Sequence, residues 1–252
     1  LNMFGYCMGG HLSVIYSALH NEFIKNLIVL ASPIDTRKSA VIDMISQGGN
    51  LDIDRIVDAF GNVPARFMQK MFSFVRDKLE KNYYGDIEAV EAVIKWANDN
   101  IDIPGEVFRK YIKEVFQNHN LCNNKMVING KFVELNKIYS NLMIITGNDD
   151  WVAPYEATTA LNNFVSSIIK EVILIEGGHL GFIAKKKSKQ IWQNIVNWLK
   201  KLDHNELVKN ESINDNNKTK QTINKPTRKK AKKSTVNGAG KVKIKNKTQA
   251  KN

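Results

Sequence analysis

"GYCMGG", residues 5–10, stands between a short apolar run, "LNMFGY" (1–6), and a segment with apolar residues at helical spacing, "GGHLSVIYSALH" (9–20). Glycines two residues before and two residues after Cys7 give the spacing of a nucleophile elbow, with cysteine in place of the usual serine. Such a tight turn leads from a strand into a helix, and at both glycines we expect a Cβ to collide with the neighbouring strand or helix. The helix N-terminus behind the sulfur favours the reactive thiolate. The stretch therefore predicts a nucleophilic cysteine, and a buried structural cysteine in a Gly-rich turn is the alternative.

Three further segments have the pattern of buried strands, because each is a short apolar run that ends in turn residues: "NLIVLASPID" (26–35), "NLMIITGNDD" (141–150) and "EVILIEGGH" (171–179). Helical periodicity follows the last two of these strands, in "PYEATTALNNFVSSI" (154–168) and "KKSKQIWQNIVNWLKKL" (186–202). Strands that alternate with helices predict an α/β fold with a doubly wound parallel sheet.

Residues 36–140 interrupt this alternation with a stretch of mostly helical periodicity. A plain connection of that length is improbable inside a compact domain. We therefore expect residues 36–140 to form an inserted cap over the carboxyl edge of the sheet, where α/β enzymes keep their active sites. The predicted core then comprises residues 1–35, which contain the elbow, and residues 141–202, followed by a tail at 203–252.

Chemically competent residues follow three of the predicted strands, with Cys7 after the first, Asp150 after the third and His179 after the fourth. Nucleophile, then acid, then histidine is the chain order of α/β-hydrolase triads. In such a triad the histidine deprotonates the nucleophile, and the carboxylate orients the imidazole and stabilises its cation. Asp149 is the alternative acid, and Asp35, after the second strand, is a third candidate. Asp150 is preferred because of its spacing from a glycine three residues before it and a proline four residues after it.

The remaining histidines and the second cysteine have weaker patterns. His11 lies in the first turn after the elbow and is expected to be a packing or surface residue, while His20 and His204 are expected to be exposed. His119 is a minor candidate for the pocket, and Cys122 is expected to be a structural or surface thiol. The sequence contains no metal-ligand spacing and no phosphate-binding loop, so we expect no metal site.

The net charge of +12 over 252 residues is concentrated at the end of the chain. Residues 203–252 contain 14 Lys and Arg but four acids, which leaves a charge of +2 on residues 1–202. Because this tail is polar and contains no aromatic residue, we expect it to be disordered, and nucleic acid is not an expected partner. No stretch approaches the ~20 apolar residues of a membrane helix, and no signal peptide precedes the first strand. Two cysteines fit a reducing cytoplasm.

The chain resembles polyhydroxyalkanoate synthases, the poly-3-hydroxybutyrate polymerases, over residues 1–200. The resemblance depends on the elbow and on four further motifs, "KWANDNIDIPGEVFRKYIKEVFQNHNL" (95–121), "VINGKFVELNKI" (127–138), "GNDDWVAP" (147–154) and "GGHLGF" (177–182). Trp151 departs from the histidine that many members have after the triad aspartate. The resemblance implies an α/β-hydrolase fold with a helical cap.

The resemblance also implies the reaction. Cys7 would attack the thioester of an (R)-3-hydroxyacyl-coenzyme A, which is a substrate, so no cofactor is expected. His179, oriented by Asp150, would activate Cys7 and then the 3-hydroxyl of the acyl group that extends the polyester. Such enzymes are cytoplasmic, act at the surface of the polyester granule and dimerise through the cap. A Cys-dependent thioesterase or depolymerase is one alternative, and an inactive remnant or interaction module is another.

The position of the elbow at the start of the sequence leads to one more expectation. In an α/β-hydrolase the backbone N–H after the nucleophile, here that of Met8, forms the oxyanion hole together with an N–H from an earlier loop. Six residues cannot supply that loop or the strands that flank the elbow strand. We therefore expect an incomplete hydrolase fold, from a truncated or split synthase whose amino-terminal half is lost or belongs to a separate chain.

Overall fold

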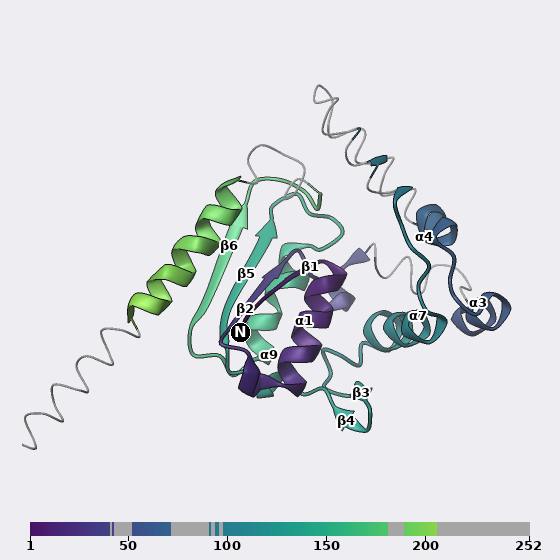
Figure 1. Ribbon diagram of the computed structural model, residues 1–252, viewed down its shortest axis with the longest axis horizontal. Coiled ribbons are helices and arrows are strands. Elements are labelled where there is room, and N and C mark those ends of the chain that lie inside the picture. Colours follow the sequence, from purple (N-terminus) through teal and green to yellow (C-terminus); the bar gives the residue numbers. More distant parts are fainter. Residues whose placement is uncertain are drawn as a thin grey trace, which may run out of the picture. The chain divides into compact units, whose positions relative to one another are not determined.

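The computed structural model describes residues 1–40, 42, 52–71, 91, 94–95, 98–180 and 189–205. The chain divides into two compact units, Leu1–Lys200 and Lys201–Asn252. In the second unit the described residues, 201–205, are helical, and the prediction of a disordered tail falls otherwise outside the described residues. Figure 1 shows the first unit as a sheet with helices around it and the helices of the insertion beside it.

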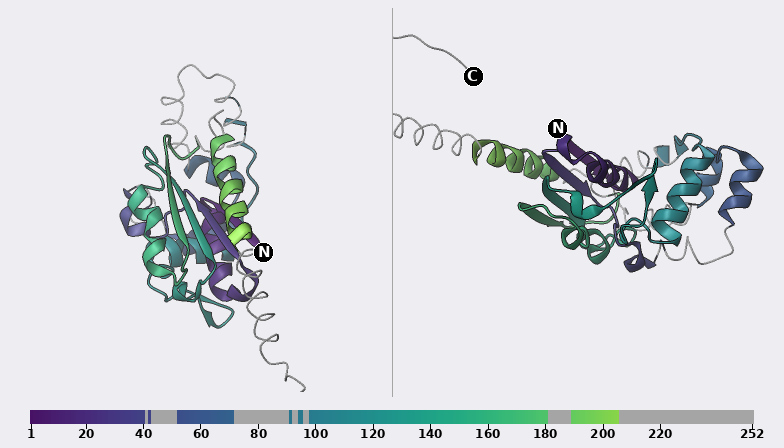
Figure 2. Two further views of the ribbon diagram at one scale, coloured as in Figure 1. Left: turned by 90° about the vertical axis from the view of Figure 1, so that its left-hand side faces the viewer. Right: turned by 90° about the horizontal axis from the view of Figure 1, so that it is seen from below.

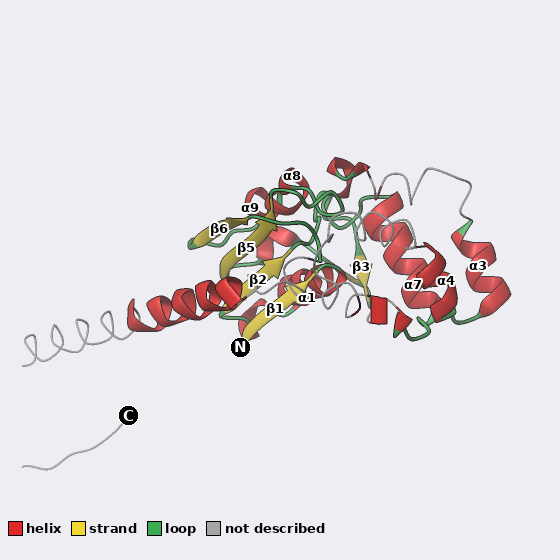
Figure 3. Ribbon diagram, turned by 90° about the horizontal axis from the view of Figure 1, so that it is seen from above, coloured by secondary structure: helices red, strands yellow, loops and turns green. Residues whose placement is uncertain are grey.

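A four-stranded sheet forms the centre of the first unit, and all neighbouring strands are parallel. Its strands are β1 (Asn2–Tyr6), β2 (Asn26–Leu30), β5 (Asn141–Gly147) and β6 (Lys170–Ile175). Their order in the sheet, β1-β2-β5-β6, follows the chain, as Figure 3 shows. The predicted α/β class with a parallel sheet is therefore confirmed.

Asparagines fix the register at the amino ends of three strands. The Asn26 side chain donates to Oδ1 of Asn2 (2.7 Å), and the Asn141 side chain donates to Oδ1 of Asn26 (2.8 Å). These three residues are also register partners in the backbone pairing of β1, β2 and β5. Because a slip by one residue would turn every side chain to the other face, this ladder keeps the strand ends aligned.

The two faces of the sheet are covered by different helices. Val14 and Ala18 of α1 (Met8–Leu19) and Leu161 of α9 (Leu161–Phe164) share one hydrophobic cluster with alternate residues of β2 and β5. On the other face of β1, the Phe4 ring lies 5.4 Å from that of Trp192, which belongs to the helical residues 189–200. The central strands β2 and β5 are almost completely buried, which explains their continuous apolar sequences.

The chain between β2 and β5 contains several short elements. They are the 3₁₀ turn Thr36–Lys38, α3 (Ile53–Phe60), α4 (Ala65–Met71), α7 (Gly105–Tyr111), a π-helical turn (Ile112–Gln117), β3 (Val127–Ile128), β4 (Lys131–Phe132) and a 3₁₀ turn (Leu135–Lys137). Figure 2 shows α3, α4 and α7 grouped together. The boundaries predicted for the cap segment, residues 36–140, stay a prediction, and residues 72–90 lie outside the described residues.

The predicted, mostly helical cap segment also contains a short hairpin, because Asn129 and Gly130 both have positive φ (48° and 77°) and turn the chain from β3 into β4. One local prediction needs correction. The helix expected over 154–168 is two short helices, α8 (Tyr155–Thr159) and α9, and the backbone is extended from Val165. Within the described part of the chain, none of the helices has both the length and the apolar character needed to cross a membrane.

Candidate active site

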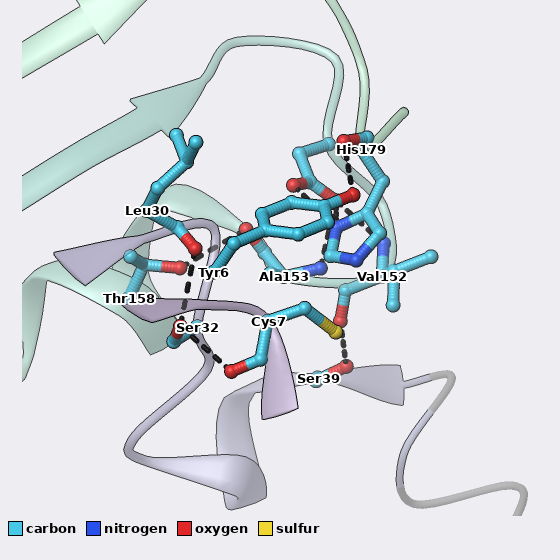
Figure 4. A network of polar contacts seen from close by, with 10 residues as sticks. Tyr6, Cys7, Leu30, Ser32, Ser39, Val152, Ala153, Thr158 and His179 are labelled. Carbon is cyan, nitrogen blue, oxygen red and sulfur yellow. Dashed lines mark hydrogen bonds and ion pairs between the residues drawn. The ribbon is translucent and has the colours of Figure 1, made fainter. Parts of the chain in front are cut away.

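Cys7 occupies a strained turn between β1 and α1. Its φ of 52° and ψ of −119° lie in a region that residues with a Cβ rarely adopt. Two contacts with the neighbouring strand end hold this conformation: the Cys7 N–H donates to the Leu30 carbonyl (2.9 Å), and the Ser32 hydroxyl donates to the Cys7 carbonyl (2.8 Å). The side chain is half-buried, and Figure 4 shows Cys7 and His179 on the same side of the elbow. The turn thus has the geometry of a nucleophile elbow.

The glycines around Cys7 have different roles from those expected. A Cβ on Gly5 would lie 2.5 Å from the Gly9 carbonyl oxygen, and a Cβ on Gly10 would lie 1.8 Å from Oγ of Ser32. At Gly9 a Cβ would meet nothing within 4 Å. The expected collision is therefore correct at Gly5 and wrong at Gly9, because the close approach between helix and strand occurs one residue later, at Gly10.

His179 and Asp150 form a buried pair after β6 and β5. The His179 Nδ1 lies 2.8 Å from Oδ2 and 3.1 Å from Oδ1 of Asp150, and the two residues are 6% and 4% exposed. The backbone N–H groups of Val152 and Ala153 donate to the same Asp150 Oδ1, at 3.1 and 2.8 Å. Because the carboxylate is held by its own loop, it fixes Nδ1–H as the donor and leaves Nε2 for another partner.

That partner is Cys7. Burial lowers the pKa of His179, but the charge of Cys7 and hydrogen bonds with Asp150 and Cys7 outweigh burial and raise it from 6.5 to about 10. Since an imidazolium is stabilised between a carboxylate and a thiolate, the arrangement can accept and return a proton at Cys7.

Tyr6 supports His179 from the strand that carries the nucleophile. Its hydroxyl donates to the His179 carbonyl (2.9 Å), and the two rings lie 5.4 Å apart. Ser39 supports the loop of Asp150 in a similar way, since its hydroxyl donates to the Val152 carbonyl (2.9 Å). Neither residue was predicted from the sequence. The position of Tyr6 directly before Cys7 was the available signal for one of them.

The two alternative acids lie elsewhere. Asp149 is exposed, and the structure places its carbonyl rather than its carboxylate beside Gly178. Asp35 is buried, and both of its oxygens accept from the Arg37 guanidinium, at 2.7 and 3.0 Å. Burial alone would raise the pKa of Asp35, but hydrogen bonds with Arg37 and its charge hold the pKa below its usual value. Of the three carboxylates only that of Asp150 contacts His179.

Cys122 and His119 belong to the surroundings of Asp35. The Cys122 sulfur lies 4.0 Å from Asp35 Oδ1 and 3.3 Å from the His119 carbonyl oxygen. The His119 Nδ1 lies 2.8 Å from the Thr36 hydroxyl. Burial raises the pKa of the Cys122 thiol, as expected for a structural cysteine. We call Cys122, His119 and Asp35 the Asp35 cluster.

The other histidines lie outside the His179–Asp150 pair, and Met8 follows the nucleophile. His11 is buried, with its Nε2 3.1 Å from the Pro33 carbonyl oxygen, and burial lowers its pKa to about 4. His20 is half-buried between aromatic rings rather than exposed, and His204 is exposed. Met8 is the first residue of α1, and the first N–H groups of a helix have no partner inside it. The Met8 N–H therefore follows Cys7 directly, at the start of α1.

Comparison with known proteins gives a consistent picture. Residues 1–186 match the family model described as alpha/beta hydrolase fold. The chain is similar to poly(3-hydroxyalkanoate) polymerase subunit PhaC of Haloferax mediterranei, with 30% identity over 79% of this chain and 43% of the relative. The subunit of the same name from Allochromatium vinosum is 31% identical over 79% of this chain and 59% of that protein. The chain thus spans about half the length of these curated relatives.

Among solved structures, the chain is similar to a monoacylglycerol lipase of Paleococcus ferrophilus. Its sequence is 15% identical, the TM-score is 0.47, and the match covers 78% of this chain and 66% of the lipase.

Proposed function

Since the chain belongs to the alpha/beta hydrolase fold family, and within it to the polyhydroxyalkanoate synthases, we propose that its Cys7, His179 and Asp150 catalyse acyl transfer from a thioester. The donor is an (R)-3-hydroxyacyl-coenzyme A and the acceptor is the hydroxyl of a second 3-hydroxyacyl group, so that the product is a polyester.

One observation supports this proposal most strongly. A buried His179–Asp150 pair presents its second ring nitrogen to a cysteine on a strained strand–helix turn. Structural cysteines do not require such a turn, whereas a nucleophile must project its sulfur out of the sheet.

In the first step the Cys7 sulfur, whose proton already lies on Nε2 of the His179 imidazolium, attacks the carbonyl carbon of the thioester. The bond to the coenzyme A sulfur then breaks, and the released thiolate takes that proton. Asp150 keeps the imidazolium oriented. The Met8 N–H donates to the oxyanion that forms on the carbonyl oxygen, since it lies at the start of the helix behind Cys7.

In the second step the 3-hydroxyl of another acyl group attacks the Cys7 thioester and loses its proton to His179. Cys7 leaves as thiolate beside the His179 imidazolium, which restores the starting state. A thioester intermediate suits this exchange because it keeps the acyl group active towards an alcohol. The chemistry needs no cofactor or metal beyond the coenzyme A ester, which is consumed as substrate.

The test is release of free thiol from (R)-3-hydroxybutyryl-coenzyme A by the full chain, measured with a thiol-reactive dye. It is made with the chain alone and with the amino-terminal half of a synthase added. Cys7→Ser is the matched variant, because it keeps the shape of the elbow but replaces the sulfur. Release that is retained by Cys7→Ser at the wild-type rate would contradict a cysteine mechanism.

The acceptor is tested in the same assay by weighing the polymer formed. Release of coenzyme A together with insoluble polyester supports the synthase, whereas release with free 3-hydroxybutyrate supports a thioesterase. Activity that appears only in the mixture supports a split enzyme. The proposal also includes a homodimer through the cap segment, a location in the cytoplasm and action at the surface of the polyester granule. No release in either case would favour a non-catalytic remnant.

A further inference from the structure

Tyr111 and His11 form a contact that the catalytic proposal does not use. Tyr111 is the last residue of α7 in the cap segment, and its hydroxyl lies 3.0 Å from Nδ1 of His11 on α1. The other ring nitrogen of His11 lies 3.1 Å from the Pro33 carbonyl oxygen, in the loop after β2. Three parts of the chain that are distant in sequence therefore meet at one imidazole.

The chemistry of the groups fixes the direction of both hydrogen bonds. A carbonyl oxygen only accepts, so Nε2 of His11 carries the hydrogen and donates it to Pro33. Nδ1 is then a bare acceptor, and the Tyr111 hydroxyl donates to it. Burial lowers the pKa of His11 to about 4, which keeps the ring neutral and the arrangement fixed at neutral pH.

His11 is linked directly to the nucleophile. Its backbone N–H lies 3.4 Å from the Cys7 carbonyl oxygen, within the first turn of α1, beside the Gly10 N–H at 3.0 Å. His11 therefore contacts the Cys7 peptide through its backbone and the Tyr111 hydroxyl through its ring. Because the Cys7 backbone is strained, its conformation depends on contacts of this kind in its surroundings.

The π-helical turn after Tyr111 explains how the cap segment reaches His11 with two rings. The Tyr111 and Phe116 rings lie 5.7 and 6.1 Å from the His11 ring, and 5.0 Å from each other. In a regular α-helix, residues five apart point roughly 140° away from each other. In the turn Ile112–Gln117, Asn118 N–H bonds to the carbonyl five residues back, at Lys113 (2.8 Å). This wider turn brings Tyr111 and Phe116 to the same side of the helix.

We propose that Tyr111 is a positioning residue, which through His11 holds the nucleophile elbow in the conformation that brings Cys7 to His179. This inference rests on the proposed function, in which Cys7 and His179 exchange a proton. Burial and the charge of Cys7 raise the pKa of Tyr111. The hydroxyl therefore remains protonated and can donate to His11.

The test measures the contact between Cys7 and His179 without any substrate. The rate at which iodoacetamide alkylates Cys7 in the full chain is followed at pH 7 by mass spectrometry of the Cys7 peptide. Replacement of His179 by Gln should slow this alkylation about tenfold, because the thiolate loses its partner. With Tyr111→Phe in the background, the same replacement should slow it only about twofold, since the elbow no longer presents Cys7 to His179.

Tyr139→Phe is the matched control, because it removes the same hydroxyl from a tyrosine that is 63% exposed. In its background the tenfold effect of His179→Gln should persist. If Tyr111→Phe lowers the melting temperature but leaves the tenfold effect, or changes neither, Tyr111 has no positioning role and the inference is overturned. If His179→Gln has no effect in the wild-type chain, it is the proposed Cys7–His179 mechanism that fails.

Discussion

The molecule contains two clusters with the same three residue types, and they differ in which groups face each other. In the first cluster, Cys7, His179 and Asp150, the carboxylate holds the imidazole, and the imidazole contacts the thiol. In the Asp35 cluster, the carboxylate is paired with Arg37, and the imidazole of His119 is turned to Thr36.

The difference teaches that composition at a strand end does not define a catalytic site. Both oxygens of Asp35 accept from Arg37, and the imidazole of His119 contacts the Thr36 hydroxyl rather than this carboxylate. Burial keeps the Cys122 thiol protonated, whereas Cys7 has an imidazolium partner. The two clusters differ in which groups contact each other, not in the types of residue that they contain.

Exchange of the cysteines should separate the clusters most strongly. Cys7→Ala should reduce thiol release from the coenzyme A ester by about 10⁶-fold, because no other group can carry the acyl chain. Cys122→Ala should stay within about threefold of the wild type, since this thiol contacts Asp35 and the His119 carbonyl and not His179. Both are measured by initial rates at saturating substrate. A similar loss in the two variants would mean that the clusters are not functionally distinct.

The two aspartates give the next largest contrast. Asp150→Asn should lower the rate by about 10³–10⁴-fold. The Val152 and Ala153 N–H groups would keep the amide oxygen, so the amide nitrogen would face Nδ1 and donate to it, which selects the wrong tautomer. Asp35→Asn keeps the site intact and should change the rate less than threefold. Rates are compared at the same fraction of folded protein, determined by circular dichroism. Normal activity of Asp150→Asn would remove this residue from the mechanism.

The elbow can also be disrupted without any change to the three functional side chains. Only Cys7, of the two cysteines, has a positive φ, and Gly5 is packed tightly behind it. Gly5→Ala should lower the free energy of unfolding by about 2 kcal/mol or more, since backbone atoms would have to move. Gly9→Ala, where the space is open, is the control and should cause no loss. Urea denaturation measures both, and equal midpoints would contradict the packing described.

The smallest expected effect is on stability against pH. The pKa of His179 is about 10 in the folded chain and 6.5 for an imidazole without partners. Between pH 6.5 and 10 the folded state therefore binds more protons than the unfolded state. Stability from this group is therefore complete below pH 6.5 and lost as the pH rises towards 10. The melting temperature of the wild type should fall by a few degrees more than that of His179→Gln across this window. Parallel curves for the two proteins would contradict a raised pKa.

Much of the fold could be predicted because its signals are local. The apolar runs of β2, β5 and β6 and the glycine spacing around Cys7 are each visible within ten residues. The preference for Asp150 over Asp149 also came from local spacing, and the structure brings the Asp150 carboxylate to His179.

The parts that could not be predicted depend on partners distant in sequence. Nothing near Gly10 indicates that Ser32 lies against it, and nothing near His11 indicates the hydroxyl of Tyr111. Asp35 forms a salt bridge with the neighbouring Arg37. The sequence alone does not show whether an aspartate pairs with such an arginine or with the catalytic histidine, because this depends on where His179 lies in the fold. The π-helical turn has no sequence pattern distinct from that of an α-helix.

The asparagine ladder has a consequence for the order of folding. Cys7 and its Leu30 anchor lie on one local strand–helix–strand unit, and Asp150 and His179 lie around a second. These two parts of the sheet meet where β2 pairs with β5 and Asn141 contacts Asn26. Residues 31–140 separate the two strands in the sequence. Closing so long a loop costs only about 0.6 kcal/mol more for each doubling of its length, but long-range pairing is slow. During refolding, the elbow with Cys7 and the pair of Asp150 and His179 should therefore form separately. They should come together in one late step, when β5 pairs with β2.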